Sequence, residues 1–138
     1  MAYSVSLVPL ERCYAEWRNA RVFLEPAIDR SGGRWRNEYV FAALIMGRHQ
    51  LWEIHDEEGI VSAFTTEFCH YPEKKTLAIH FLGGKGMSDF YADLSETVTR
   101  YAREQGCDAI ECNARSGFWT WFKHDGFDKV SVFYEKAL

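Results

Sequence analysis

The sequence predicts an α/β (α+β) domain in which helices cover a mixed central sheet, and two observations lead to that prediction. The first is the order of segments with extended and helical periodicity, which is β-α-α-β-β-β-α-β-α-β. The second is a glycine-rich loop, Leu82–Met87, that joins a strand to a helix and is followed by another strand. Such a crossover places Thr76–Leu82 parallel to Ala109–Cys112.

The first part of the chain supplies one strand and two helices. Ser4–Val8 alternates in polarity and predicts a strand. Apolar residues at helical spacing predict a helix over Leu10–Phe23, which Pro26 ends or kinks. Ser31–Gly33 breaks the chain, and a second apolar stripe predicts a helix over Arg36–Gly47.

The second part begins with a meander of strands and continues with the crossover helix. The strands are expected at Gln50–His55, Ile60–Tyr71 and Thr76–Leu82. Ser88 or Asp89 is expected to cap a helix that runs to Gln105. The remaining expected elements are a strand at Ala109–Cys112, a helix at Gly117–His124 and a last strand at Lys129–Glu135. No linker or repeat interrupts this order, so we expect residues 1–138 to form a single domain.

Composition and charge exclude several kinds of partner. The formal net charge is −4, whereas a nucleic-acid-binding surface needs a basic footprint, and no nucleic-acid partner is expected. No segment approaches the roughly 18 apolar residues of a membrane span, so no membrane partner is expected either. The 4 cysteines form no C-x-x-C pair and no signal peptide is evident, which favours a cytoplasmic location. The 5 histidines lack helical H-x-x-x-H spacing, so we expect no metal.

The loop Gly83–Met87 has the backbone features of an anion site. It leads into a helix, whose N-terminus offers free N–H groups and the positive end of the helix dipole. Glycines let a phosphate approach the main chain. The loop is neither a Walker A motif nor G-x-G-x-x-G, and a tight structural turn is the alternative interpretation.

In its element order the chain resembles the GNAT superfamily of acyl-CoA-dependent N-acyltransferases. Gly84-Lys85-Gly86 matches the G-x-G part of that family's cofactor loop, and Gly126-Phe127 matches its terminal Gly-Phe. The resemblance implies that the loop amides hold the pyrophosphate of acetyl-CoA, and that an N–H at Phe81 or Leu82 polarises the thioester carbonyl. The cofactor-binding residues that it implies are Phe81, Leu82, Gly83, Gly84, Lys85, Gly86, Met87 and Ser88.

Several stretches also resemble a family of small GNAT-like proteins encoded by tailed bacteriophages and prophages. This resemblance implies a phage protein located in the host cytoplasm or associated with the virion. The stretches are Arg30–Trp35, His49–Trp52, Tyr71-Pro72, Phe81–Gly84 and Ala102–Asp108.

The sequence departs from the GNAT pattern at positions that matter for catalysis. Phe81 stands where the family has Gln or Arg at the start of the cofactor loop. Phe122 stands where many members carry the Tyr that protonates the departing thiolate. Arg115 and Phe118 replace the Asn and Ala usual in that stretch. The Phe122 departure removes a specific general acid.

A strand pairing supplies a candidate base. If the turn is centred on Glu73-Lys74, Glu67 lies directly opposite His80. An opposed carboxylate and imidazole can share a proton and activate an amine, so Glu67 and His80 are the predicted catalytic pair. The alternative is a solvent-facing cross-strand pair, and a register slip of one residue would place the two side chains on opposite faces.

Arg34, Trp35 and Glu111 are the predicted substrate residues. Arg34 and Trp35 follow the glycines between the first two helices, a segment that often walls the acceptor site in GNAT proteins. Glu111 lies on the strand next to the one that carries His80. Packing at the start of a helix is the alternative for Trp35, and an exposed strand position is the alternative for Glu111.

Two functions are compatible with these residues. The first is an acetyl-CoA-dependent N-acyltransferase that acts on a small-molecule or protein amine. The alternative is a catalytically inactive GNAT-fold phage accessory or virion-associated binding protein. In either case the last strand, Lys129–Glu135, could pair with a second copy to form a homodimer.

Overall fold

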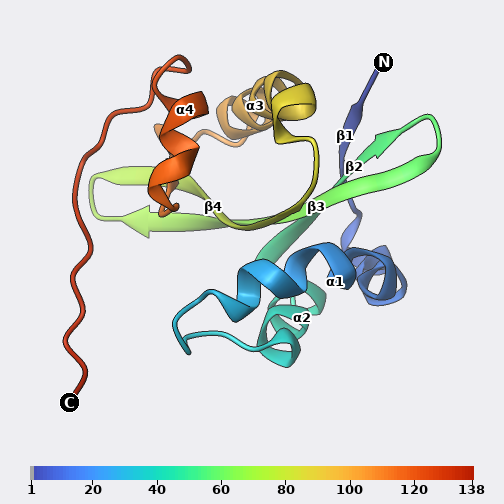
Figure 1. The fold of residues 1–138 in the computed structure, drawn as a ribbon, viewed down its shortest axis with the longest axis horizontal. Coiled ribbons are helices and arrows are strands. Elements are labelled where there is room, and N and C mark those ends of the chain that lie inside the picture. Colours follow the sequence, from blue (N-terminus) through green and yellow to red (C-terminus); the bar gives the residue numbers. More distant parts are fainter. Residues whose placement is uncertain (1) are drawn as a thin grey trace.

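The computed structural model describes residues 2–138, and five strands in that part of the chain form one sheet (Figure 1). The strands in chain order are β1 (Ser4–Leu7), β2 (His49–Asp56), β3 (Gly59–Tyr71), β4 (Lys74–Gly84) and β5 (Ala109–Cys112). The helices are α1 (Cys13–Asp29), α2 (Asn37–Ile45), α3 (Met87–Glu104) and α4 (Trp119–Phe122). Short 3₁₀ turns precede α1 and α4, at Leu10–Arg12 and Ser116–Phe118.

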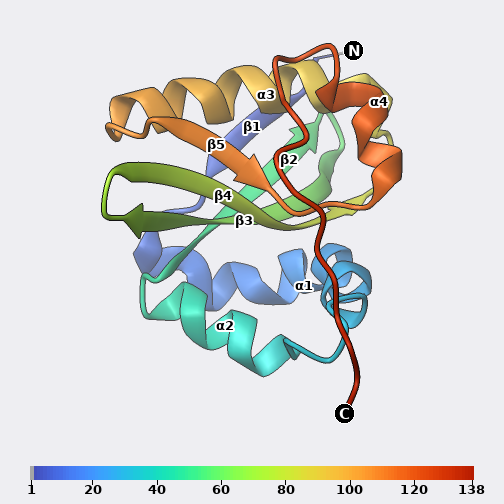
Figure 2. The ribbon, with the colours of Figure 1, turned by 90° about the vertical axis from the view of Figure 1, so that its left-hand side faces the viewer.

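The strands lie side by side in the order β1-β2-β3-β4-β5. All neighbouring pairs are antiparallel except β4 and β5, which are parallel. The predicted mixed sheet and the parallel crossover through α3 are therefore confirmed. Figure 2 shows α1 and α2 on one face of the sheet and α3 on the other.

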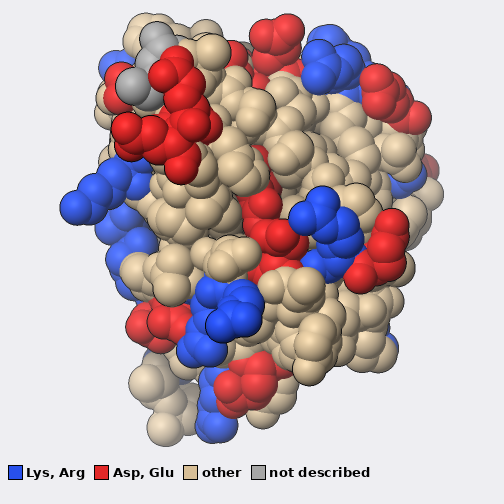
Figure 3. All heavy atoms as spheres, turned by 90° about the vertical axis from the view of Figure 1, so that its right-hand side faces the viewer, with Lys and Arg blue, Asp and Glu red and all other residues tan. Residues whose placement is uncertain are grey.

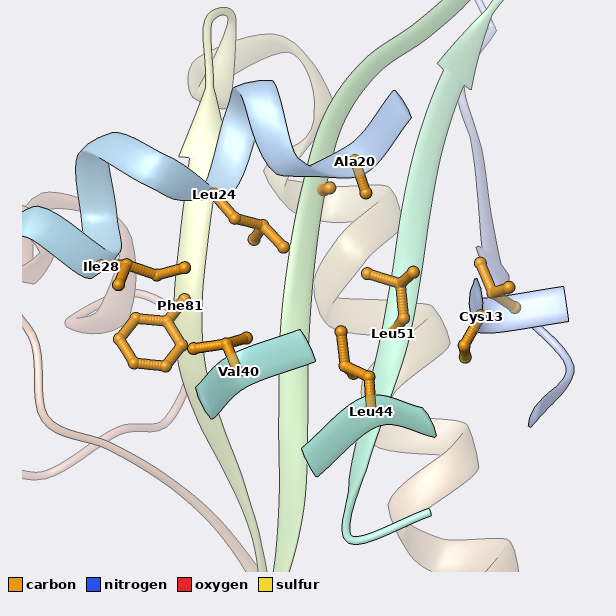
Figure 4. Packing of buried hydrophobic residues seen from close by; sticks show 10 residues of the cluster. Cys13, Ala20, Leu24, Ile28, Val40, Leu44, Leu51 and Phe81 are labelled. Atoms are coloured by element: carbon orange, nitrogen blue, oxygen red, sulfur yellow. The ribbon is translucent and has the colours of Figure 1, made fainter. Parts of the chain in front are cut away.

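The face under α1 and α2 is closed by a continuous apolar layer. In Figure 4, Leu24 and Ile28 of α1 lie beside Val40 of α2 and Phe81 of β4, and all of these side chains are buried. Burial of such a side chain contributes roughly 1.5–3 kcal/mol. This layer therefore holds α1 firmly against the strand that carries His80.

The opposite face is covered by α3. The buried residues of α3 recur at helical spacing, at Phe90, Leu94, Val98 and Ala102. Beneath them Trp52 of β2 stacks on Phe64 of β3, with ring centroids 5.5 Å apart. Two separate cores thus hold one sheet, and the candidate site lies on the α1/α2 face.

The pairing of β3 with β4 differs from the predicted register. The hairpin loop consists of Pro72 and Glu73, because Tyr71 pairs with Lys74, and Glu67 lies opposite Ala78 instead of His80. The shift amounts to two residues. A shift of two keeps every side chain on its face of the sheet, so Glu67 and His80 remain on the same face as diagonal neighbours.

The first helix does not end at Pro26, as the sequence suggested it could. Pro26 lies inside α1, which continues to Asp29. Proline removes only the N–H that would bond to the carbonyl of Val22, and Val22 is on the exposed side of the helix, where water can reach that carbonyl. The buried contacts of Leu24 and Ile28 hold the last turn in place.

The predicted last strand at Lys129–Glu135 is wrong. Residues 127–138 have no regular secondary structure, and Figure 2 shows them running past the edge of the sheet toward the α1/α2 side. The segment has an alternating pattern, but no strand in residues 2–138 pairs with it, and β5 pairs only with β4. The expected pairing with a second copy stays a prediction.

On the face in Figure 3, acidic and basic side chains are interspersed among uncharged ones and do not separate by sign. Within residues 2–138, no helix has the length and apolar character needed to cross a membrane.

One carboxyl group is buried between α1 and the sheet. Glu53 of β2 is only 6% exposed, and its Oε2 has no hydrogen-bond partner among the described residues. Burial raises the pKa of Glu53 to about 7, and the hydrogen bond to Glu16 and the charge of Glu16 add to the rise. Glu53 carries the proton of this pair. The pKa of Glu16 is lowered, chiefly by its hydrogen bond with Glu53. His55 lies 3.7 Å from Glu53 Oε1.

We expect Glu53→Gln to stabilise the protein at pH 8 and to change little at pH 5. The folded state keeps Glu53 protonated where the unfolded chain ionises it, so this stability is present at low pH and is lost as the pH rises from the usual value toward about 7. The lowered pKa of Glu16 offsets part of this loss, so the expected gain at pH 8 is about 1 kcal/mol. Denaturant unfolding at both pH values measures the change in the free energy of unfolding. The exposed control Glu57→Gln should show no pH-dependent gain, and equal effects of the two variants would refute the assignment.

Candidate functional site

Glu67 of β3 and His80 of β4 meet on the α1/α2 face of the sheet. Glu67 Oε1 lies 2.7 Å from His80 Nε2. The expectation that the two side chains meet is confirmed, although they are diagonal neighbours and not directly opposed. A bulge brings them together: Phe64 pairs with Leu82 and Thr66 with Ile79, so His80 and Phe81 share one position opposite Thr65.

His49 of β2 completes the group, and sequence reasoning missed it. His49 lies directly opposite Glu67, and its Nε2 is 3.1 Å from Glu67 Oε2. Each carboxylate oxygen of Glu67 therefore contacts a different imidazole. A register shift between Ile54 and His55 produces this pairing, and no turn residue in the sequence marks that shift.

The two imidazoles lie under the ring of Trp35. The centroid of Trp35 is 5.4 Å from that of His49 and 6.0 Å from that of His80, and the two imidazole centroids are 4.8 Å apart. The hydroxyl of Ser31 fixes the loop by accepting a hydrogen bond of 3.0 Å from the backbone N–H of Trp35. Trp35, predicted as a substrate residue, is thus placed on the candidate base.

His49 is buried, and its environment keeps it neutral. Burial lowers the pKa of His49 most, and the neighbouring His80 lowers it further, while Glu67 acts in the opposite direction. Its Nδ1 is buried without a hydrogen-bond partner among the described residues. His80 and Glu67 are partly open, with side-chain exposures of 22% and 32%. His80 thus lies between the buried His49 and solvent.

A cavity of about 1080 Å³ begins beside His80. It forms because β4 and β5 stay paired only as far as Ile79 and Cys112, whereas β4 continues to Gly84. The cavity touches His80 on one face of the sheet and Met87, the first residue of α3, on the other. The divergence of the two strands therefore connects the two faces.

The other predicted substrate residues line this cavity without joining the His–Glu group. Arg34 contacts the C-terminal segment, with Nη2 2.8 Å from Glu135 Oε1 and its guanidinium 5.0 Å from the centre of the Phe133 ring. Glu111 accepts a hydrogen bond of 2.8 Å from the Tyr71 hydroxyl. That bond is the largest cause that raises the pKa of Tyr71 to about 12.

Each glycine of the predicted cofactor loop has a distinct role. A Cβ on Gly83 would lie 1.6 Å from the carbonyl oxygen of Phe23, so this glycine allows α1 to approach β4. Gly84 has φ +127°, and a Cβ there would lie 2.7 Å from the Val61 oxygen. Gly86 has φ +88° and is the N-cap of α3, where Ser88 or Asp89 was predicted.

The start of α3 leaves several backbone N–H groups free. Asp89 and Phe90 donate to the carbonyl of Gly86. In the described part of the chain, the backbone N–H groups of residues 85–88 donate no hydrogen bond to a side chain. They also donate none to a backbone carbonyl in a turn, loop or helix cap. Lys85 and Ser88 are exposed. The N-terminus of α3 therefore has the free donors that an anion requires.

Phe81 and Leu82 have different surroundings. The Phe81 side chain is buried in the α1/α2 layer, and its N–H donates to Thr65 Oγ1 at 3.3 Å. The predicted role of the Phe81 amide in polarising a carbonyl conflicts with this bond. Leu82 lines the cavity, so its position remains available for that role.

The position expected to hold a general acid is aromatic and apolar. Phe122 lines the cavity and stacks on Phe127, with centroids 4.5 Å apart. Tyr91, whose ring centroid is 6.3 Å from that of Phe122, has a hydroxyl that donates to Asp125 Oδ2 at 2.5 Å. Burial and this bond raise the pKa of Tyr91, so its hydroxyl holds its proton tightly.

Solved acetyltransferase structures match the chain over nearly its whole length. An aminoglycoside acetyltransferase from an uncultured soil metagenomic sample has a TM-score of 0.73 and 12% identity, with 100% of this chain and 99% of that chain covered. A ribosomal-protein-alanine N-acetyltransferase from Brucella melitensis biovar Abortus 2308 has a TM-score of 0.69 and 12% identity, with 99% of each chain covered.

A predicted acetyltransferase from Clostridium acetobutylicum, solved with acetyl-CoA, has a TM-score of 0.68 and 11% identity and covers 99% of this chain and 96% of its own. At such identities the match establishes the fold alone: the chain has the mixed five-stranded sheet and the helices of the GNAT acetyltransferases. No protein-family model and no curated protein matches the sequence.

We expect Gly83→Ala to destabilise the fold. The added methyl group overlaps the Phe23 carbonyl, and the overlap can be relieved only if α1 moves away from β4. Overpacking of this kind costs about 1–3 kcal/mol. Chemical denaturation measures the loss. Gly117→Ala is the matched control, because a Cβ there meets no atom within 4 Å, and a similar loss in both variants would contradict the packing role of Gly83.

Proposed function

We propose that the protein is an acetyl-CoA-dependent N-acyltransferase. The observation that carries the proposal is the single cavity that touches both His80 and the first residue of α3. Met87, where the cavity meets α3, belongs to the segment 85–88, whose free backbone N–H groups are suited to a diphosphate. The other end adjoins a carboxylate–imidazole pair suited to deprotonating an amine.

The cofactor would bind through the backbone at the start of α3. The N–H groups of residues 85–88 and the helix dipole favour a pyrophosphate, and the left-handed conformation of Gly86 turns the chain into the helix. The absence of Gln or Arg at Phe81 removes no backbone donor of this set, since Phe81 packs into the core. A structural neighbour solved with acetyl-CoA supports this choice of cofactor.

The transfer step requires the amine to lose a proton and the thioester to lose its thiolate. With Nε2–H donating to Glu67, His80 keeps a lone pair on Nδ1 that takes the amine proton, and Glu67 stabilises the resulting imidazolium. The amine nitrogen bonds to the acetyl carbon, the C–S bond breaks, and the Leu82 N–H polarises the carbonyl. The thiolate takes its proton from solvent, because Phe122 has no acidic proton and Tyr91 keeps its own in the hydrogen bond that it donates to Asp125.

The acceptor is an amine of a small molecule or a protein. Trp35 covers the imidazoles, and Arg34 and Glu111 line the cavity that leads to them. Glu111 adds a negative charge that favours a cationic amine over a neutral one. The structural neighbours named as an aminoglycoside acetyltransferase and as a ribosomal-protein-alanine N-acetyltransferase are compatible with either kind of acceptor.

The alternative is a GNAT-fold binding protein without catalysis, encoded by a phage and active in the host cytoplasm or on the virion. Phe81 and Phe122 favour it, because they replace side chains that take part in the usual reaction. The two functions differ in a simple respect, since a binding protein that has lost catalysis need not retain acetyl-CoA.

We expect acetyl-CoA to bind and Gly86→Asp to weaken that binding by about tenfold or more, since a carboxylate would repel the pyrophosphate. Calorimetric titration measures both affinities. Gly86→Asn is the matched control, because it has the same size and the same positive-φ backbone without the charge. No heat up to about 1 mM acetyl-CoA, or equal losses in Asp and Asn variants, would contradict the proposed cofactor site.

We expect His80→Gln to lower kcat about 100-fold and to leave the affinity for acetyl-CoA unchanged, because the imidazole acts on the amine and not on the cofactor. Release of free CoA thiol in the presence of a panel of amines measures the rate in chelator-treated protein. His70→Gln, an exposed histidine on β3, is the control and should keep full activity. A His80→Gln variant as fast as the control would exclude His80 as the base.

A further inference from the structure

Three side chains from three neighbouring strands converge on one point. A ring nitrogen of His49, a ring nitrogen of His80 and a carboxylate oxygen of Glu67 all lie within 4.8 Å of one another. We propose that His49, Glu67 and His80 form a binding site for a divalent transition-metal ion such as Zn²⁺. The expectation of no metal rested on helical histidine spacing, whereas these ligands come from separate strands.

The distances suit a shared ion. In a tetrahedral site with Zn–N and Zn–O bonds of about 2.0–2.1 Å, neighbouring ligand atoms are roughly 3.3 Å apart. The Nε2 atoms of His49 and His80 lie 3.1 and 2.7 Å from the two oxygens of Glu67. Rotation of the side chains would bring these atoms, now within 4.8 Å of one another, to that spacing around an ion that replaces the shared protons.

The donor set and its scaffold favour binding. Two imidazoles and one carboxylate, with a further position open, form the ligand pattern of metal sites that keep an exchangeable water. β2, β3 and β4 are paired along the segment, so the backbone that carries the ligands is held in place and only side chains need to move. No Lys or Arg forms an ion pair with Glu67 in residues 2–138, which leaves its charge for the ion.

The surroundings set the expected affinity and access. The ion would enter from the cavity beside His80, while Trp35 and the buried His49 shield the other side. A metal-bound imidazole usually donates its second N–H to an acceptor, and the loss of such a partner costs about 10–100-fold in affinity. His49 Nδ1 has no partner among the described residues, so micromolar binding is expected instead of nanomolar.

Occupancy would also inhibit the transfer reaction, a consequence that rests on the proposed function. With the ion on Nε2, the remaining proton of His80 moves to Nδ1, and the lone pair that accepts the amine proton is lost. The ion would then compete with catalysis for the same imidazole.

Direct metal binding tests the site without acetyl-CoA, so its failure is separate from failure of the proposed function. Chelator-treated protein is titrated with Zn²⁺ against a chromophoric competitor, and Co²⁺ reports ligand geometry by its visible absorption. We expect one ion per chain, with affinity reduced about tenfold or more in His49→Gln and Glu67→Gln. His70→Gln should bind as the wild type does. Circular dichroism confirms that each variant is folded.

Two outcomes would overturn the proposal: no Zn²⁺ binding up to about 1 mM, or binding that His70→Gln and His49→Gln weaken equally. If the variants do not fold, X-ray absorption of the Co²⁺-loaded wild type counts the imidazole ligands of the ion instead. Two imidazole ligands support the site, and one or none refutes it.

Discussion

The bulge in β4, where His80 and Phe81 together lie opposite Thr65, is the constraint on which the site depends. One extra residue lets two successive side chains of a strand face the α1/α2 side. Phe81 then enters the apolar layer and anchors the strand, while His80 reaches Glu67. Without the extra residue, either the anchor or the imidazole would point toward α3.

The bulge is held by close packing from α1. Gly83 brings the main chain of β4 against the Phe23 carbonyl, and the Ser62 hydroxyl donates to the Gly83 carbonyl from β3. These contacts fix β4 just beyond the point where β5 leaves it. The glycine-rich segment thus has two functions: its first residue allows the packing, and its last, Gly86, opens the N-terminus of α3 toward an anion.

The element order and the crossover followed from periodicity because they depend on local patterns of polarity. The Glu67–His80 contact was also predictable, although the turn was placed at Glu73-Lys74 instead of Pro72-Glu73, because a slip of two residues preserves the face. His49 was not predictable, since its position depends on an unmarked register shift in β2. Lys129–Glu135 alternates like a strand, yet alternation specifies a face and not a pairing partner.

The divergence of β4 and β5 constrains how the proposed reaction would use this cavity. α3, whose first turn carries the free N–H groups, lies on one face of the sheet (Figure 2), and the imidazoles contact Trp35 on the α1/α2 face. Under the proposed function, a cofactor held at α3 would present its thioester through the gap between the strands. The amine would then approach from the α1/α2 side, where Trp35 covers the imidazoles and Arg34 holds the C-terminal segment. In that arrangement the residues beside the acceptor lie outside the glycine-rich loop, so the loop alone would not determine the substrate.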